Sequence, residues 1–324
     1  MSYQRHSKRI AILLATHNGE KYIKDQINSL IKQKIRGNIS LFISDDGSTD
    51  KTILIIKKLV KNTKIKTKKI LHVNFKSPFL NFLNLIQSVP SSYNYYFFCD
   101  QDDIWLPNKL KISIKNIDSG TDLYISDLYI INDQVFEKKK ISQVINFSKN
   151  LNQPYNNYSK KNFLFFLNNS RVNGNVMAIS KKLFYNFKKD KIMYNYSHDH
   201  FLLLYSFLLD YKVFFDKKKL IIHRIHENNF SVQNTFFKKL IRIIENFNNN
   251  SIKKNNRNIE NLKKIIKNKK KVNKNNITDF NNFFKYKNFI FDLRSISTFF
   301  SLELKKKSLF NTFLFYIMYF LKKI

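Results

Sequence analysis

The sequence predicts an α/β fold: a mainly parallel central sheet flanked by helices, followed by a basic and mostly helical C-terminal extension. Short apolar runs alternate with amphipathic stretches over roughly the first third of the chain, which is the pattern of parallel strands joined by crossover helices. Polar clusters directly follow three of these runs, as expected where strands end at a ligand-binding edge. A helical, lysine-rich pattern beyond Phe230 indicates the extension.

The first half of the chain repeats a strand and helix unit. Its apolar runs are short, as buried strands are. Strands are predicted at Ile10–Ala15, Ile39–Ser44, Ile70–Val73, Tyr95–Cys99 and Leu123–Ile131. Between them, apolar residues recur three and four positions apart, which predicts helices. These are Glu20–Gln33, Asp50–Val60, Phe79–Val89 and a helix opened by Pro107, where proline is tolerated.

The second half is less regular. Glu137–Ser159 is polar and asparagine-rich, and we interpret it as a loop or an insertion on the acceptor side of the domain. Asn246–Asn276 is dominated by asparagine and lysine, which indicates a solvated helix or a linker. Ordered segments are predicted at Phe163–Leu167, Val172–Ile179, Phe201–Leu209, Val213–Phe215 and Leu220–Ile225.

A length of 324 residues allows one main domain and a smaller appendage. We predict a domain over residues 1–231, with halves at 1–116 and 117–231. Residues 232–324 form the predicted extension.

The formal charge of +35 suggests an anionic partner at first sight. However, lysine is accompanied by abundant Asn, Ile, Phe and Tyr, all residues with AT-rich codons, so genome composition accounts for much of the excess. From Ser231 onward, 21 basic residues face 5 acidic ones. The C-terminal third is therefore the candidate for contact with an anionic membrane, and the N-terminal third is not.

Cysteine usage and apolar segments bear on location. The single cysteine, Cys99, can form neither an intrachain disulfide nor a thiolate metal cluster, which fits a reducing compartment. The apolar run Ile10–Leu14 is too short for a signal-peptide core. Leu309–Leu321, flanked by lysines, either lies in a membrane interface or forms a buried helix. We expect a cytoplasmic protein, with peripheral contact with the inner membrane as a further expectation.

Three polar clusters follow predicted strands: residues 15–20, 44–50 and 100–103. In Asp100-Gln101-Asp102, two nearby carboxylates leave a strand together and offer hard oxygen ligands for Mg²⁺ or Mn²⁺, with a nucleotide diphosphate completing the shell. Alternatively, Asp102 or Asp103 caps the following helix. Asp45 and Asp46 are suited to hydrogen bonds with a nucleoside, although a strand-to-helix turn explains them as well.

Taken together, Ala15-Thr16-His17-Asn18-Gly19, Asp45-Asp46-Gly47-Ser48-Thr49-Asp50 and Cys99-Asp100-Gln101-Asp102-Asp103-Ile104-Trp105 resemble family 2 glycosyltransferases of the GT-A fold, a Rossmann-like architecture. The resemblance is greatest to the bacterial rhamnosyltransferase-like branch and covers roughly Arg9 to Ser231. It implies that Thr16, Asn18, Asp45 and Asp46 line the nucleoside pocket. It also implies that Asp100 faces the ribose and the metal, and that Asp102 is the principal metal ligand.

Within the same resemblance, Asn74 to Phe82 is similar to the family's Asn-x-Gly…Asn-Phe stretch, but Lys76 and Ser77 stand where a glycine is common. Trp105 either packs in the core beneath the metal loop or lines the sugar pocket.

The second half carries three further motifs. Ser197-His198-Asp199-His200-Phe201 resembles the family's His-Asp-aromatic motif, which implies that Asp199 is the catalytic base; a helix N-cap is the alternative. The turn containing Asn173 and Gly174 resembles one beside the acceptor, though a plain β-turn explains it equally.

The segment His223-Arg224-Ile225-His226 resembles the family's Tyr-Arg-x-His ending, with His223 at the tyrosine position. The resemblance implies that His226 completes the metal shell, while a structural role is the alternative. Arg224 is suited to phosphate as a forked donor.

The resemblance implies an inverting transferase that moves a sugar, with rhamnose favoured, from a dTDP- or UDP-sugar to a glycan or lipid-linked acceptor in cell-surface polysaccharide synthesis, such as O-antigen or capsule. Its metal is Mg²⁺ or Mn²⁺, and no nucleic acid is expected as partner. Two alternatives stay open. A non-catalytic protein binding nucleic acid or an anionic surface would need clustered lysines among aromatics. A metal-dependent nucleotidyltransferase would need a glycine-rich phosphate loop, which Gly19 alone does not make.

Overall fold

The computed structural model describes residues 8–132, 172–190 and 197–227, together with residues 267, 272 and 278. The segments Glu137–Ser159, Phe163–Leu167 and Leu309–Leu321, and nearly all of Asn246–Asn276, lie outside the described residues. The chain divides into two compact units, Met1–Asn273 and Lys274–Ile324, and every strand and helix below belongs to the first. The boundary predicted at residue 231 also falls outside the described residues, so it stays a prediction.

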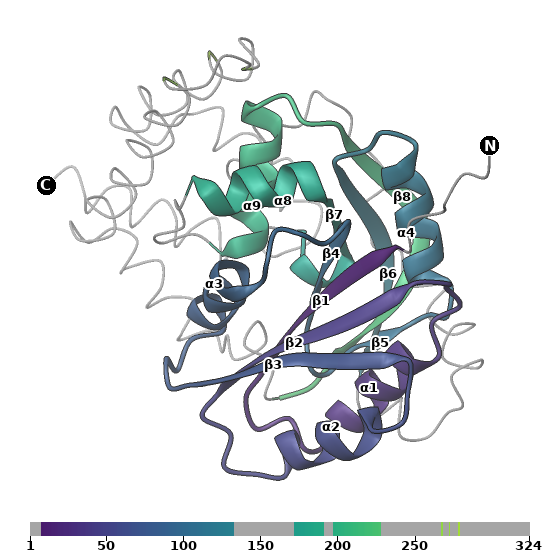
Figure 1. Ribbon diagram of the computed structural model, residues 1–324, viewed down its shortest axis with the longest axis vertical. Coiled ribbons are helices and arrows are strands. Elements are labelled where there is room, and N and C mark those ends of the chain that lie inside the picture. The colour runs from purple at the N-terminus through teal and green to yellow at the C-terminus, as the bar shows by residue number, and fades with distance from the viewer. Residues whose placement is uncertain are drawn as a thin grey trace, which may run out of the picture. The chain divides into compact units, whose positions relative to one another are not determined.

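The described part contains eight strands that form one mixed sheet (Figure 1). The strands are β1 (Arg9–Thr16), β2 (Asn38–Asp46), β3 (Ile65–Val73), β4 (Tyr95–Cys99), β5 (Ile104–Trp105), β6 (Leu123–Asn132), β7 (Met177–Ser180) and β8 (Val213–Ile225). The helices are α1 (Ile23–Ile31), α2 (Thr52–Val60), α3 (Pro78–Ser88), α4 (Lys109–Asp118), α8 (Lys181–Lys189), α9 (His198–Leu208) and the short 3₁₀ turn η2 (Gly174–Val176).

The sheet has the order β3-β2-β1-β4-β7-β6-β8-β5. Strands β3, β2, β1 and β4 are parallel, and β7 runs antiparallel between β4 and β6. Strand β8 is parallel to β6, and the two-residue β5 pairs with it in the opposite direction. The predicted α/β class with a mainly parallel sheet is therefore confirmed, and the reversed strands join the two halves of the domain into one sheet.

Burial explains why the first strands are so apolar. Ile10 to Leu14 in β1 and Tyr96 to Cys99 in β4 are fully buried, because helices cover both faces of the sheet and leave no solvated side. Helices α1 and α2 lie together, while α3, α8 and α9 form a separate group (Figure 1). The parallel strands β1, β2 and β4 thus have apolar interiors, and polar residues follow at their carboxyl ends.

Two details of the second half differ from the sequence-based prediction. The runs Val213–Phe215 and Leu220–Ile225 belong to one strand, β8, because the charged residues between them continue the pairing with β6 through register irregularities. Helix α8 was not predicted, although Leu183, Phe184 and Phe187 are buried on one face and Ser180 caps it. Among the described residues, no helix is long and apolar enough to cross a membrane.

The Ser180 hydroxyl joins β7, α8 and β6. It accepts a hydrogen bond from the Leu183 amide at 3.2 Å and donates one to the Asp122 carboxylate at 3.2 Å. Ser180→Ala removes both interactions, so we expect the free energy of unfolding to fall by about 1–2 kcal/mol. Urea unfolding checks this. Ser119→Ala is the control, because that hydroxyl is exposed, and an equal loss in both variants would contradict the assignment.

Candidate functional site

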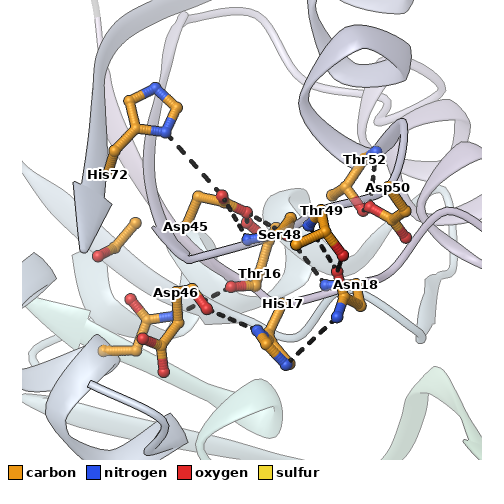
Figure 2. Close-up of polar contacts among 12 residues, drawn as sticks. Thr16, His17, Asn18, Asp45, Asp46, Ser48, Thr49, Asp50, Thr52 and His72 are labelled. Atoms are coloured by element: carbon orange, nitrogen blue, oxygen red, sulfur yellow. Dashed lines mark hydrogen bonds and ion pairs between the residues drawn. The ribbon is translucent and has the colours of Figure 1, made fainter. Parts of the chain in front are cut away.

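The polar clusters after β1, β2 and β4 meet at one edge of the sheet. Asp45, at the end of β2, is 2% exposed. Its carboxylate accepts hydrogen bonds from the Thr16 hydroxyl at 2.7 Å and from the Ser48 hydroxyl at 2.6 Å. The exposed His72 ring on β3 lies 3.9 Å from the same carboxylate (Figure 2). Asp45 is therefore fixed between three strands and reaches solvent only at the rim.

The neighbouring Asp46 holds the loop between β3 and α3. Its two oxygens accept the backbone amides of Phe75, Lys76 (3.1 Å) and Ser77 (2.9 Å). The His17 imidazole contacts the Asp46 backbone oxygen at 2.5 Å (Figure 2). Because Asp46 is 2% exposed, most of the bonding capacity of its carboxylate serves this loop.

Lys76 has a φ of +52°, in the left-handed region that glycine adopts most easily. The Asp46 carboxylate accepts the Lys76 amide and the two neighbouring amides, and these bonds hold the backbone in this conformation. Lysine is tolerated here, but at a cost in backbone strain.

Asn18 ties the first polar loop to the second. It also has a positive φ, +44°, and its side-chain oxygen accepts the Thr49 amide at 2.9 Å (Figure 2). Asp50 repeats the link, accepting the Glu20 amide at 2.9 Å and the Thr52 hydroxyl at 2.5 Å. Burial raises the pKa of Asp50, but these hydrogen bonds outweigh it and hold the pKa below its usual value.

Gln101 joins the loop after β4, residues 100–103 (the acidic loop), to the loop after β1. Its amide group accepts the His17 N–H at 2.9 Å and donates to the His17 carbonyl at 2.8 Å. A Cβ on Gly19 would lie 2.3 Å from the Gln101 side-chain oxygen. A side chain at this position would therefore displace the Gln101 amide and break its two hydrogen bonds to His17.

Asp100 and Asp102 lie in a crowded acidic setting. The pKa of Asp100 is raised well above its usual value, first by burial and then by the nearby carboxylates of Asp103, Asp102 and Asp199. Asp102 meets the His226 imidazole, with 3.0 Å between Oδ2 and Nε2. Loops that are far apart in the sequence thus bring four carboxylates and a histidine to one place.

Asp103 has no exposed surface, and it is bonded from two sides. Its Oδ1 lies 2.8 Å from Nδ1 of His223 on β8, and its Oδ2 accepts the Asn175 side-chain amide from η2. Behind it, the buried Lys109 ammonium donates to the Asn175 carbonyl at 3.0 Å and lies 4.7 Å from the centre of the Trp105 ring. Burial lowers the pKa of Lys109 to about 7.

Tyr22 supports the end of β8. His226 stacks on its ring at a centroid distance of 4.3 Å, and the Arg224 guanidinium lies 4.8 Å from the ring centre. Arg224 also donates to Asp25 on α1 at 2.9 Å. The side chain of Arg224 is only 5% exposed, so the structure gives it an anchoring role beside its predicted contact with phosphate, which stays a prediction.

Asp199 lies in the first turn of α9. Its Oδ2 accepts the Gly174 amide at 3.1 Å, and its Oδ1 accepts the His200 amide at 2.7 Å. A Cβ on Gly174 would come within 2.5 Å of the His198 ring, which stacks on Phe82 at 4.1 Å. Gly174 is therefore needed for close packing between η2 and the helix that carries Asp199.

The residues present fit a divalent cation. Burial first, and neighbouring carboxylates second, raise the pKa of Asp100, and a bound cation would favour its ionised form. Among the described residues, no three His, Cys, Asp or Glu side chains converge closely enough to hold a metal by themselves. Asp102, with Asp100 and His226 beside it, would therefore bind the ion together with oxygens from a ligand such as a diphosphate.

Trp105 and Asn173 are the remaining residues that the sequence predicted for the site. Trp105 is 1% exposed on β5, so it packs in the core beneath the acidic loop. Asn173 directly precedes η2 and is partly buried. The sequence reasoning missed Tyr22, Asp25 and Lys109, and it did not foresee that Asn175, in the turn predicted beside the acceptor, bonds to Asp103. A lysine inside a helix gives no local signal, because its role depends on contacts that are distant in sequence.

Comparison with known proteins identifies the family of this chain. The family model described as Glycosyl transferase family 2 matches residues 11–188. A dTDP-rhamnosyl transferase of Shigella flexneri is 31% identical over 234 residues, which cover 69% of this chain and 75% of that protein. An uncharacterized glycosyltransferase of Rickettsia typhi is 27% identical over 241 residues, covering 70% and 67%.

Solved structures match the fold. A mannosyltransferase from Pyrobaculum calidifontis, in complex with GDP-Man and Mn²⁺, gives a TM-score of 0.55 at 10% identity, covering 99% of this chain and 82% of that one. S. aureus TarS 1-349 in complex with UDP-GlcNAc gives 0.53 at 18% identity, covering 70% and 61%. This chain therefore spans less than two thirds of that TarS structure. The GT-A fold expected from the sequence is confirmed.

The pair formed by Asp103 and His223 predicts a pH-dependent stability. Burial lowers the pKa of His223, but Asp103, Asp102 and Asp100 raise it further, to about 9. The imidazolium therefore stabilises the fold fully below about pH 6.5, the usual histidine pKa, and this contribution is lost as the pH rises through about 9.

His223→Asn keeps a donor near Asp103 and removes the charge. We expect the wild type to be more stable than this variant at pH 6 and the difference to shrink by about pH 9.5. Urea unfolding with EDTA present measures both. A difference that stays constant or grows with pH would show that the imidazolium does not stabilise Asp103.

Proposed function

Because the chain belongs to glycosyl transferase family 2, we propose that it transfers a sugar, with rhamnose the first candidate, from a dTDP- or UDP-linked donor to a hydroxyl of a glycan or lipid-linked acceptor. The observation that carries the proposal is the convergence of Asp100, the pair of Asp102 and His226, and Asp199 at the carboxyl ends of the strands. Family membership rules out the non-catalytic and nucleotidyltransferase alternatives.

The donor assignment rests on the S. flexneri relative, a dTDP-rhamnosyl transferase. Thr16, Asn18, Asp45 and Asp46 are the proposed nucleoside-side residues, and they lie together on the first two loops. The proposed role is cell-surface polysaccharide synthesis, with O-antigen and capsule as candidate products. The proposed location is the cytoplasm, which the presence of a single cysteine, Cys99, supports.

A bound Mg²⁺ or Mn²⁺ would supply a Lewis acid next to the diphosphate. Asp102 would be its main protein ligand, and Asp100 and His226 would lie beside it. The Tyr22 ring stacks on His226, and the Arg224 guanidinium packs on that same ring. The metal centre thus depends on α1 and β8 as much as on the acidic loop.

In the proposed reaction, Asp199 is the base. The Gly174 and His200 amides hold its two oxygens. An acceptor hydroxyl attacks the anomeric carbon and its proton passes to Asp199 as the new C–O bond forms. The bond from the anomeric carbon to the phosphate oxygen breaks, and its electron pair leaves with the nucleoside diphosphate. A single displacement inverts the anomeric configuration.

Nucleotide binding tests the donor side. We expect dTDP and UDP to bind in titration calorimetry only when Mn²⁺ is present. Asp102→Asn should weaken this binding at least about 10-fold, because hydrogen bonds to a charged group are worth about 1.5–3 kcal/mol and the variant also loses a charged ligand. Asp118→Asn, at a surface ion pair with Lys8, is the control. Metal-independent binding, or an unaffected Asp102→Asn variant, would refute the metal assignment.

The role of Asp199 is tested separately. Asp199→Asn keeps an acceptor oxygen but cannot take a proton, so we expect transfer to fall by roughly 10²–10⁴-fold while nucleotide binding stays within about 2-fold. The measurement is sugar transfer from dTDP-rhamnose, with dTDP titration on the same preparation. Transfer retained in this variant would exclude Asp199 as the base.

A further inference from the structure

The chain between Lys51 and Cys99 contains nine lysines and not one aspartate or glutamate. It covers α2, β3 and α3. Genome composition explains frequent lysine but not the local absence of acids, since five acidic residues occur between Glu20 and Asp50. Lys51 lies 4.0 Å from Glu20, outside the segment, but no acid within the segment neutralises the other eight lysines.

The outer face of α2 carries part of this charge. Lys57 and Lys58 lie three and four positions after Leu54, and therefore on the same side of the helix, and Lys61 directly follows its last residue. All four are exposed, and Leu54 is 64% exposed. An apolar side chain thus projects into solvent beside three ammonium groups.

Strand β3 continues the surface. It follows α2 directly, packs against it and forms one edge of the sheet (Figure 1). Lys66, Lys68 and Lys69 are exposed along it. Within the described part of the chain, none of the three, nor Lys57, Lys58 or Lys61, has an ion-pair partner.

Lysines on an edge strand have a simpler explanation, because they prevent the edge from pairing with another chain. That explanation is sufficient for the lysines of β3. It does not account for α2, which offers no unpaired backbone, nor for an exposed leucine among its lysines. A leucine between lysines suits the boundary between lipid headgroups and acyl chains, whereas a nucleic-acid surface would call for interleaved aromatics.

We propose that the lysine surface formed by the outer face of α2 and by β3 docks the protein on an anionic phospholipid bilayer. Each lysine that lies within a Debye length of the membrane is attracted to the anionic headgroups, and each contributes a similar free energy of binding. Leu54 inserts at the interface. This surface lies in the N-terminal third, which the overall charge distribution had left out.

Cosedimentation of the full chain with phosphatidylcholine vesicles, with and without phosphatidylglycerol, tests the proposal. The triple variant Lys57→Gln, Lys58→Gln, Lys61→Gln should bind the anionic vesicles roughly 100-fold more weakly, from about one kilocalorie per mole for each lysine. Leu54→Ser should weaken the binding that persists at high salt. A control triple variant removes the same charge from exposed positions elsewhere: Lys111→Gln, Lys115→Gln and Lys217→Gln. It should change vesicle binding by less than about 3-fold.

Equal losses in the two triple variants would assign the effect to net charge and overturn the proposal. Undiminished binding by the α2 variant would overturn it too, by placing the membrane contact elsewhere. Binding to RNA in preference to the vesicles would assign the surface to nucleic acid instead. Titration of dTDP with Mn²⁺ should be unchanged in the α2 variant, so failure of this proposal stays separate from failure of the proposed transferase site.

Discussion

A carboxylate with no exposed surface is the constraint on which this site depends. Burying an ionised Asp103 costs several kcal/mol unless its oxygens are paired and hydrogen-bonded. The partners are His223 and Asn175, which lie 120 and 72 positions away along the chain. Satisfying one buried group therefore draws β8 and η2 against the acidic loop, and this fixes where Asp100 and Asp102 point.

Hydrogen bonds of a short turn also link the acidic loop to Asp199. Turn η2 contacts the acidic loop through Asn175 and the first turn of α9 through the Gly174 amide. Its three residues span the space between Asp103 and Asp199. The relative position of the two carboxylate groups is thus set by a short turn, not by the large surfaces of the sheet, so small changes there act on both halves.

The sequence predicts the donor half of the fold well and the rest less well, for physical reasons. Strand β4 begins and ends where the apolar run does, because parallel strands buried on both faces leave an uninterrupted signal. Strand β8 was divided in two because Asp216 to Lys219 lie at a solvated stretch of a single strand. The motifs locate Asp102, Asp199 and His226, but the contacts of Tyr22 with His226 and of Lys109 with Asn175 arise only when distant segments meet.

The left-handed backbone at Lys76 has a consequence for the robustness of the fold. The chain has only five glycines, and four described non-glycine residues have positive φ: Asn18, Asn62, Lys76 and Asp210. Asparagine and aspartate tolerate this conformation, whereas lysine does so at a cost of order 1 kcal/mol. The bonds from Asp46 maintain it, and part of their free energy is consumed in doing so. A sequence poor in glycine therefore reaches the same architecture with less net stability in the loop between β3 and α3.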